Sequence, residues 1–391
     1  MSDVLRVGMV GYAFMGAAHA QAWRNAHRFF AMPLTPELTA VAGRSQEAVR
    51  TAAERLGFTS TETDWRRLVE RDDIDLIDIC TPGDSHAEIA IAALKAGKHV
   101  LCEKPLANTV EEAEQMSTVA RAAVERGVWA MCGFTYRRTP ALALARRLVE
   151  AGRIGTVRQV RAQYLQDWLH DPDAPMTWRL DKSKSGSGAL GDLGAHLVDT
   201  AQWLTGQGIT GVSAILETFV KSRPLSGERS GLGGHGDTAA DAPRGDVTVD
   251  DAALFTARFA GGATGVFEAT RFALGRKNAL RIEINGTDGS LAFDFEENNV
   301  LQFFDSTEPI DEQGFRRILV TEPEHPYVSA WWPPGHGLGY EHGFTHQAVD
   351  LVTAIAESRQ PEPSFDDGLL VQRVLGAVED SAARDSAWTT V

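Results

Sequence analysis

The chain has 391 residues, of which 43% are hydrophobic and 23% charged, and its formal net charge at pH 7 is −15. This length allows two domains with separate cores, and the composition is that of an ordinary soluble globular protein. The acidic balance argues against a surface for nucleic acids or anionic membranes, so we expect neither as a partner.

The sequence also predicts the compartment. It contains no apolar run of the ~18 residues that cross a membrane, and it enters a strand at once, without a signal peptide. The cysteines Cys80, Cys102 and Cys132 lie apart from one another, in or beside apolar runs. An odd number of isolated cysteines is typical of a reducing compartment, where such thiols act as small buried hydrophobes. We therefore expect a cytoplasmic protein.

The first predicted element is an apolar strand that ends in a glycine turn and runs into a helix. Gly11 and Gly16 hold the outer positions of a G-x-G-x-x-G dinucleotide fingerprint, and Ala13 replaces its middle glycine. Backbone N–H groups and the positive end of the helix dipole can hold a pyrophosphate at such a turn. We therefore expect Gly11, Ala13, Phe14, Met15 and Gly16 to bind a dinucleotide. A glycine turn without a nucleotide is the alternative.

The second predicted strand, at residues 38–42, ends at Gly43, Arg44 and Ser45. In dinucleotide-binding folds this strand end meets the adenine ribose. An acidic residue there selects NAD, and a basic residue with a small hydroxyl accommodates the 2′-phosphate of NADP. Arg44 and Ser45 therefore favour NADP. The alternative is that Arg44 is only a solvated charge at a helix start.

Strands and helices alternate from here to residue 134. The predicted helices are 45–56, 65–70, 87–96 and 110–126, and the predicted strands are 74–80, 97–102 and 128–134. This alternation indicates a parallel, doubly wound sheet, whose ligand crevice lies outside the carboxyl ends of the strands. Thr81 and Pro82 follow one of these strands and Lys104 follows the next. We expect all three at the same sheet edge as the glycine turn.

Lys104 is the first catalytic candidate. It comes directly after a buried strand and before a proline, which keeps the preceding residue extended. At the cofactor edge of a sheet, its flexible ammonium can hold an alcohol oxygen or transfer that oxygen's proton. A surface lysine at a strand end is the alternative.

The periodicity changes after residue 136. A predicted helix at 140–151 and a strand at 156–167 lead through a loop to a glycine-rich segment and a helix at 192–204. Asp192 and His196 are four residues apart in that helix and share one face. A carboxylate and an imidazole in this arrangement can act as an acid–base pair. The alternative is that Asp192 stabilises the helix dipole and His196 is an ordinary histidine.

The rest of the chain is rich in strands. They are predicted at 212–220, 252–259, 264–271, 280–285, 290–295 and 300–304, and short turns between them indicate an antiparallel meander. Residues 222–246 are predicted as a long loop that contains His235, and residues 331–336 as a second loop that lines a sugar pocket or anchors itself through its tryptophans. Two helices, at 341–357 and 367–384, close the chain. C-x-x-C and H-E-x-x-H spacings do not occur, and we expect no metal.

With these residues placed, the chain resembles the Gfo/Idh/MocA family, which includes glucose–fructose oxidoreductase and inositol dehydrogenase. The resemblance runs over nearly the whole length. Its motifs are the glycine turn Gly11–Gly16, Thr81-Pro82 with His86, Glu103-Lys104-Pro105, Tyr136-Arg137, and the glycine-rich helix start with Asp192 and His196. Within the family, residues 164–168 and 186–192 are most similar to sugar dehydrogenases of the levoglucosan dehydrogenase type.

The resemblance implies an α/β protein with two domains. Residues 1–134 would form an NAD(P)-binding Rossmann domain, and residues 135–391 a substrate-binding and oligomerisation domain with an open, mainly antiparallel sheet. The last helices can pack back on the first domain, and a homodimer or homotetramer is expected. The resemblance adds His86 and Glu103 to the cofactor site and Tyr136 to the substrate site. The chain departs from the family pattern at Ala13 and at Gly43-Arg44, where members that prefer NAD carry an acidic residue.

Together these expectations describe an NAD(P)-dependent oxidoreductase that oxidises a ring hydroxyl of a sugar, sugar derivative or polyol, or reduces the corresponding ketone. The implied catalytic set is Lys104, which would hold the alcohol oxygen, His196, which would accept its proton, and Asp192, which would orient the substrate or the imidazole. The expected substrate wall consists of Gln166, Trp168, Trp178 and Arg179, since tryptophan faces stack on sugar rings. The alternatives are a non-catalytic nucleotide-binding regulator, a 1,5-anhydro-sugar reductase, or an inositol or dihydrodiol dehydrogenase, among which the residue pattern does not choose.

Overall fold

The computed structural model describes residues 3–225 and 242–391, and the chain folds into two compact units. The first unit contains Met1–Arg138 and Leu338–Gln372, and the second contains Thr139–Gly337 and Arg373–Val391. None of the helices in the described residues is long and apolar enough to span a membrane. His235, in the predicted loop, lies outside the described residues.

The first unit is built on a six-stranded sheet with the order β3-β2-β1-β4-β5-β6, in which every neighbouring pair is parallel. Its strands are β1 (Val4–Val10), β2 (Thr35–Ala42), β3 (Ser60–Glu62), β4 (Leu76–Ile79), β5 (His99–Cys102) and β6 (Ala130–Cys132). The strand order reverses between β1 and β4, and ligands of such sheets bind outside the carboxyl ends of the strands at that point. The predicted doubly wound parallel sheet is confirmed.

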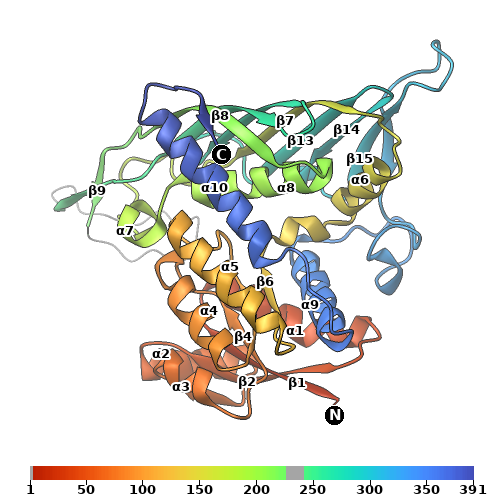
Figure 1. The fold of residues 1–391 in the computed structure, drawn as a ribbon. Coiled ribbons are helices and arrows are strands. Elements are labelled where there is room, and N and C mark those ends of the chain that lie inside the picture. The colour runs from red at the N-terminus through yellow and green to blue at the C-terminus, as the bar shows by residue number, and fades with distance from the viewer. Residues whose placement is uncertain (1–2, 226–241) are drawn as a thin grey trace. The chain divides into compact units, whose positions relative to one another are not determined.

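Helices pack on this sheet. They are α1 (Phe14–Phe29), α2 (Gln46–Leu56), α3 (Trp65–Glu70), α4 (His86–Lys95), α5 (Val110–Val124) and α9 (Tyr340–Ala356). Ser45, Asp64 and Thr109 cap the starts of α2, α3 and α5 with their side chains. Helix α5 begins with a capping box between Thr109 and Glu112, and α4 lies beside α5 (Figure 1). The core joins Val7 and Met9 of β1 to Trp23 of α1 and to Leu351 of α9, so the returning chain completes this unit.

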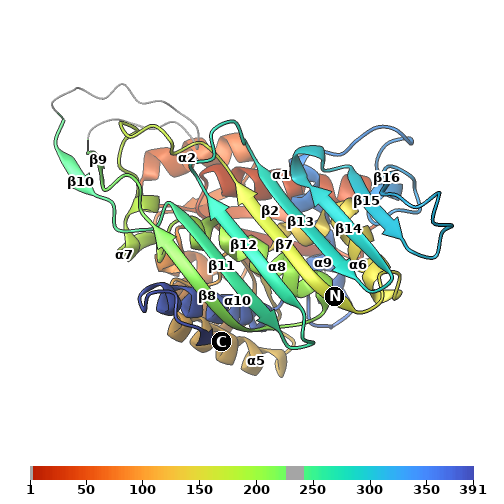
Figure 2. The same cartoon turned by 90° about the horizontal axis from the view of Figure 1, so that it is seen from above.

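The second unit contains a nine-stranded sheet with the order β16-β15-β14-β13-β7-β12-β11-β8-β17. The strands are β7 (Val157–Leu165), β8 (Ile209–Glu217), β11 (Ala252–Phe259), β12 (Thr264–Thr270), β13 (Ala279–Gly286), β14 (Gly289–Asp294), β15 (Val300–Asp305), β16 (Arg316–Leu319) and β17 (Thr389–Thr390). Figure 2 shows this sheet face on. It is mainly antiparallel, as predicted, but β7 and β12 pair in parallel, so the meander is interrupted. Turn signals specify only hairpin partners, and β7 enters between β12 and β13 from far earlier in the chain.

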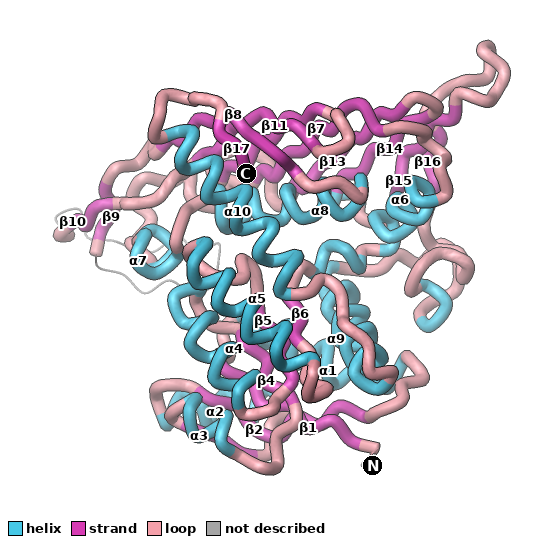
Figure 3. Tube along the Cα trace, in the orientation of Figure 1, coloured by secondary structure: helices cyan, strands magenta, loops and turns pink. Residues whose placement is uncertain are grey.

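Helices cover one face of this sheet. Helices α6 (Pro140–Glu150) and α8 (Ala195–Thr205) belong to the second unit, as does the short α7 (Lys182–Ser185), and the strand and helix layers are separated by colour in Figure 3. Helix α10 (Phe365–Ala382) belongs to the first unit up to Gln372 and to the second from Arg373. Two short strands, β9 (Ser222–Pro224) and β10 (Arg244–Asp246), form an antiparallel pair. The prediction of loop over all of residues 222–246 was therefore wrong at both ends.

Candidate active site

The glycine turn has the tight geometry that its sequence predicts. Gly11 has φ +94°, and a Cβ there would lie 2.7 Å from the Cys80 carbonyl oxygen. A Cβ on Gly16 would lie 2.3 Å from the Gly11 oxygen, so the turn and the start of α1 exclude larger residues at both positions. Ala13 is the N-cap of α1 and no side chain caps this helix end. Its first N–H groups are therefore available to an anion.

The other residues predicted at this turn lie around the same helix start. Phe14 and Met15 occupy the first two positions of α1. The ring of Phe14 is 48% exposed and stacks on that of Tyr340 in α9, with 6.2 Å between the ring centroids. Tyr340 was not singled out from the sequence, because its place beside the turn depends on the return of the chain to the first unit.

The end of β2 is closed by the ring of Tyr12. A Cβ on Gly43 would lie 2.0 Å from Tyr12 Cε1, so the ring occupies the space that a side chain at residue 43 would need. Arg44 is exposed beside it. The Ser45 hydroxyl accepts a hydrogen bond from the Ala48 N–H at 3.4 Å and so caps α2.

The loops that follow β4 and β5 are joined by His86. Its Nε2 lies 2.9 Å from the Thr81 carbonyl oxygen and its Nδ1 lies 3.0 Å from the Pro105 carbonyl oxygen, and its side chain is buried. The Ser85 hydroxyl lies 2.7 Å from Thr81 Oγ1 and 2.9 Å from the Pro82 carbonyl oxygen. His86 thus links the two loops that carry Thr81 and Lys104.

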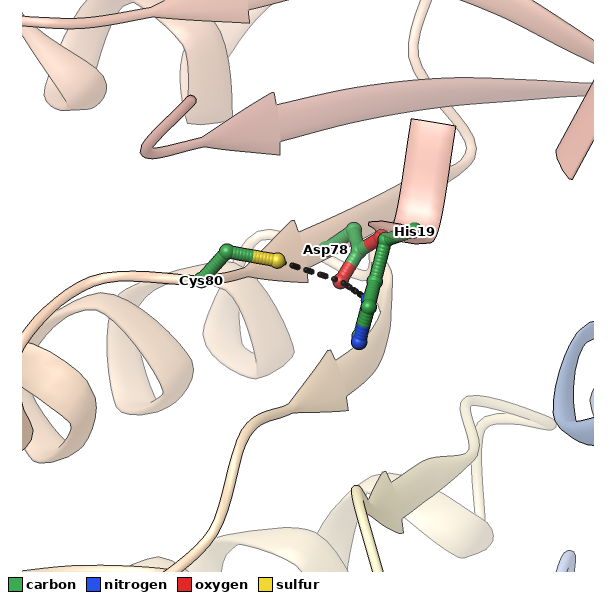
Figure 4. A group of neighbouring side chains, drawn as sticks. All are labelled: His19, Asp78 and Cys80. Carbon is green, nitrogen blue, oxygen red and sulfur yellow. Dashed lines mark hydrogen bonds and ion pairs between the residues drawn. The ribbon is translucent and has the colours of Figure 1, made fainter. Parts of the chain in front are cut away.

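A buried ion-pair network lies beneath these loops and was not predicted from the sequence. His19 Nδ1 lies 2.9 Å from Asp78 Oδ1, and His19 Nε2 lies 2.9 Å from Glu103 Oε1 (Figure 4 shows the His19–Asp78 side). The indole N–H of Trp23 donates to Asp78 at 2.7 Å, and the Cys80 thiol lies 3.5 Å from Asp78. The only signal in the sequence is polar residues at inward positions of an apolar helix and an apolar strand.

The charges around His19 favour the protonated form of its imidazole. Burial opposes a charge on His19, but the Asp78 carboxylate outweighs this effect, and the pKa of His19 lies well above its ordinary value. Burial likewise raises the pKa of the Cys80 thiol, so this cysteine is inert. Donor atoms of His19, Asp78 and Cys80 lie within 4.8 Å of one another. Since both ring nitrogens of His19 meet carboxylate oxygens at hydrogen-bond distance, we interpret this group as an ion pair and not as a metal centre.

Lys104 lies two residues after the end of β5, next to this network. Glu103 turns its carboxylate inward, where Oε1 meets His19 and Oε2 accepts the N–H of Lys104 at 3.2 Å. Glu103, which was expected at the cofactor site, is buried, and its carboxylate is bonded to His19 and to the N–H of Lys104. Tyr136 lies in a 3₁₀ turn, Thr135–Arg138, after β6 of the same unit, and it is buried as well.

Asp192 and His196 lie together in the second unit. Asp192 belongs to a π-helical turn, Leu190–Gly194, and His196 to the first turn of α8. The predicted continuous helix from residue 192 was therefore wrong in its first turn. The His196 ring lies 5.8 Å from that of Tyr164 between centroids, and Asp192 Oδ2 lies 3.9 Å from Nη1 of the buried Arg271. π-Helical turns occur frequently at functional sites.

The predicted substrate-wall residues of this unit form two groups. The first group is centred on Gln166, whose amide N–H donates to Asn278 Oδ1 at 2.8 Å and whose carbonyl oxygen accepts the indole N–H of Trp168 at 2.8 Å. The hydroxyl of Tyr164 donates to the same Asn278 oxygen at 2.7 Å. This chain of hydrogen bonds leads to the ring beside His196. Asn278 was missed, because nothing in the sequence connects it to residues more than a hundred positions earlier.

The second group contains Trp178 and Arg179. The guanidinium of Arg179 lies 4.4 Å from the centre of the Trp178 ring, which is 39% exposed. Burial lowers the pKa of Arg179, with an opposing effect from the Asp192 carboxylate. Arg179 therefore shares the electrostatic environment of Asp192.

His342 and His346, one turn apart in α9, form an H-x-x-x-H spacing that the sequence reasoning passed over. His342 Nδ1 accepts from the Gly339 N–H at 3.0 Å, and His346 Nδ1 lies 2.9 Å from the Arg138 carbonyl oxygen. Burial lowers the pKa of His346 to about 3. These contacts give both histidines local structural partners.

The chain is similar to known proteins over its whole length. Residues 5–134 match the oxidoreductase family with an NAD-binding Rossmann fold, and residues 142–292 match the GFO/IDH/MocA C-terminal domain. A levoglucosan dehydrogenase of Pseudarthrobacter phenanthrenivorans is 43% identical over 99% of this chain and 98% of its own length. An oxidoreductase domain protein from Kribbella flavida has a solved structure with a TM-score of 0.94 and 65% identity, and each chain covers 100% of the other. A levoglucosan dehydrogenase solved with NADH and levoglucosan has a TM-score of 0.91 and 41% identity, with 99% of each chain covered.

Proposed function

The chain belongs to the GFO/IDH/MocA family and is an oxidoreductase with an NAD-binding Rossmann domain, and on this premise we propose that it oxidises a ring hydroxyl of a sugar or sugar derivative. The observation that carries this proposal is the similarity to a levoglucosan dehydrogenase over 99% of the chain. Anhydro-sugars of the levoglucosan kind are therefore the first substrates to test, before inositols and other polyols.

The first unit has the features that a dinucleotide requires. The start of α1 offers uncapped N–H groups, and the adjacent glycines keep side chains away from the turn. When bound, the nicotinamide exchanges a hydride with the substrate carbon. Lys104 would donate a hydrogen bond to the alcohol oxygen and so favour its alkoxide character.

In the second unit, His196 would accept the hydroxyl proton and Asp192 would orient the substrate or the imidazole. The oxidation then balances: the carbon loses a hydride to the cofactor, the hydroxyl loses a proton to His196, and the C–O bond becomes a carbonyl. Gln166, Trp168, Trp178 and Arg179 would form the substrate wall, and we propose Tyr136 as a further substrate-binding residue. Supporting observations are the Tyr164–His196 ring contact and the hydrogen-bonded row that leads to it.

For the cofactor, we propose NADP as the preferred dinucleotide. The exposed Arg44 and the Ser45 hydroxyl favour a 2′-phosphate, and Tyr12 fills the space where an acidic side chain at residue 43 would stand. The relatives solved with NADH favour NAD instead. The ratio of kcat/KM with NADP to kcat/KM with NAD decides between the two cofactors. Arg44→Ala is expected to lower kcat/KM with NADP and to leave kcat/KM with NAD unchanged. If the unmodified enzyme prefers NAD, Arg44 does not bind a 2′-phosphate and is only a solvated charge.

The test of the function is a panel of anhydro-sugars, hexoses, inositols and other polyols, each assayed with NAD and NADP by the absorbance of the reduced nicotinamide. Turnover on a carbohydrate is the expected result. Tight binding of a reduced dinucleotide without turnover on any member of the panel would instead favour a nucleotide-binding regulator.

We further propose that the protein is a homodimer or homotetramer that pairs through the exposed face of the large sheet. Ile215, Leu254 and Val266 are 57%, 44% and 57% exposed on its neighbouring strands. Val266→Glu is expected to reduce the molar mass measured by light scattering, whereas Val124→Glu, on α5, is the control and should leave it unchanged.

The buried free thiols of Cys80, Cys102 and Cys132 support a reducing, cytoplasmic location.

A further inference from the structure

A buried aspartate holds the segment that carries the two proposed acid–base residues. Asp250 Oδ1 accepts the N–H of Gly188 at 2.7 Å, and Oδ2 accepts the N–H of Leu190 at 2.7 Å. The backbone oxygen of Asp250 accepts the N–H of Ala189 at 3.1 Å. Three successive N–H groups of the glycine-rich segment are thus bonded to one residue, which lies about sixty positions later in the chain.

These three N–H groups lie at the start of the π-helical turn that contains Asp192: Gly188 and Ala189 precede the turn, and Leu190 is its first residue. Groups in this position have no partner within a helix and need one from outside. A carboxylate at this end also interacts favourably with the helix dipole. Asp250 therefore acts as a cap from a distant loop, and the chain continues without a break through Asp192, whose N–H donates to the Gly188 oxygen at 3.0 Å, into α8 and His196.

The contact is too close to permit another residue at position 188. A Cβ on Gly188 would lie 1.8 Å from the Asp250 carbonyl oxygen and 2.8 Å from Arg271 Nη2. The same carbonyl oxygen accepts a hydrogen bond from Arg271 Nη2 at 3.1 Å, and the other terminal nitrogen of Arg271 lies 3.9 Å from Asp192 Oδ2. Asp250 is thereby linked to Asp192 by two routes, one through the backbone and one through a buried guanidinium.

We infer that Asp250 is a positioning residue for the reaction. It fixes the π-helical turn, and thereby holds the Asp192 carboxylate and the His196 ring in the positions from which they contact the substrate hydroxyl. This inference rests on the proposed roles of Asp192 and His196. Asp250 is 7% exposed and bonded on both oxygens, so it acts through the segment that it holds and not on the substrate itself.

The test replaces the carboxylate by an amide of the same shape. In Asp250→Asn one acceptor becomes an NH₂ group that faces a backbone N–H, and the segment must shift. Misplacement by about 1 Å costs roughly 100-fold in rate, so we expect kcat to fall by about 10- to 100-fold. NADPH affinity, measured by nicotinamide fluorescence, should stay within about twofold, because the glycine turn is untouched. Each rate is divided by the number of NADPH-binding sites found by titration, so that misfolded protein is not counted.

Asp251 provides the matched control. It is the next residue, it is fully buried, and its carboxylate accepts the N–H groups of Phe219 and Val220 at 2.8 and 3.1 Å. Asp251→Asn therefore disturbs hydrogen bonds to a different segment, and it should lower stability while kcat per NADPH site is retained. If it lowers kcat as much as Asp250→Asn does, the effect is general and the inference is overturned.

The inference and the proposed function can fail separately. Full turnover by His196→Asn would overturn the proposed function and the inference with it. An impaired His196→Asn beside a fully active Asp250→Asn would overturn the inference alone. Where Asp250→Asn yields no protein that binds NADPH, Arg271→Lys tests the same linkage from its other end. A fall in kcat of about tenfold is expected, and an unchanged kcat would refute the linkage.

Discussion

The ion pair beneath the cofactor edge allows a test of charge as well as of fold. His19 is 1% exposed and contacts a carboxylate oxygen at 2.9 Å through each of its ring nitrogens. His19→Gln removes the positive charge and leaves Asp78 and Glu103 buried without their shared partner. Breaking a buried ion pair costs about 3–5 kcal/mol, which corresponds to a fall in Tm of about 6–20 °C for a unit of this size.

The pH dependence separates the loss of charge from a loss of packing. The pKa of His19 is raised by Asp78 in spite of burial, so the folded state retains a proton that the unfolded chain releases near pH 6.5. This contribution to stability is complete below pH 6.5 and declines by about 1.4 kcal/mol per pH unit as the pH rises toward the pKa of the folded state. Urea unfolding at pH 6.5, 7.5 and 8.5 should therefore show that the variant loses less stability with rising pH than the wild type does.

His99 supplies the comparison for this measurement. It is a largely buried histidine of the same unit, but burial lowers its pKa to about 4, so it is neutral over the whole range. His99→Gln is expected to change stability by the same amount at each pH. If the difference between wild type and His19→Gln is equally flat from pH 6.5 to 8.5, the His19 imidazole is neutral in the folded protein and our account of the network is wrong.

Three further predictions concern the cofactor site, the reaction and acid stability. Gly16→Ala places a methyl group 2.3 Å from the Gly11 oxygen, so NADPH titration should show binding weakened by about tenfold or more, and unchanged affinity would contradict the geometry of the turn. Lys104→Met should lower kcat by about 10²–10⁴-fold with NADPH affinity retained, and wild-type turnover would exclude Lys104 from the reaction. The pKa of His346 is lowered to about 3, so below pH 6.5 this histidine binds a proton in the unfolded chain but stays neutral in the folded protein. The folded state is therefore destabilised as the pH falls. Thermal unfolding between pH 6.5 and 4.5 should therefore show that His346→Gln loses less stability than the wild type, and parallel losses would refute this.

Residues 1–134 of the first unit could be predicted closely, apart from the short β3, because most of their elements are specified by neighbouring residues. Thr109 and Glu112 form the capping box at the start of α5, and Gly57 takes the left-handed conformation that ends α2. The second sheet was harder, because pairing between strands distant in sequence has no local signal. The parallel pair of β7 and β12 therefore had no counterpart in the prediction.

The same distinction separates the two kinds of residue in the candidate site. Lys104 stands at a strand end and Asp192 four residues before His196, and both patterns are visible over a few positions of the sequence. Asp250 and Arg271 are recognisable only when the fold places a carboxylate against three N–H groups and a guanidinium near Asp192. His19 is comparable, since its role depends on carboxylates 59 and 84 residues away.

In this fold, motif residues and the buried residues that position them have to be tested by different substitutions. Substitutions at motif residues test which groups meet the substrate, but they leave open what fixes those groups before the substrate arrives. In an enzyme of this kind the cofactor supplies the hydride chemistry, and the protein contributes mainly position and proton transfer. Position is set by buried charges that bond to backbone, such as Asp250 with Gly188 and Leu190. The largest effects away from the substrate should therefore come from these few buried carboxylates, and not from the exposed residues that lie nearer to it.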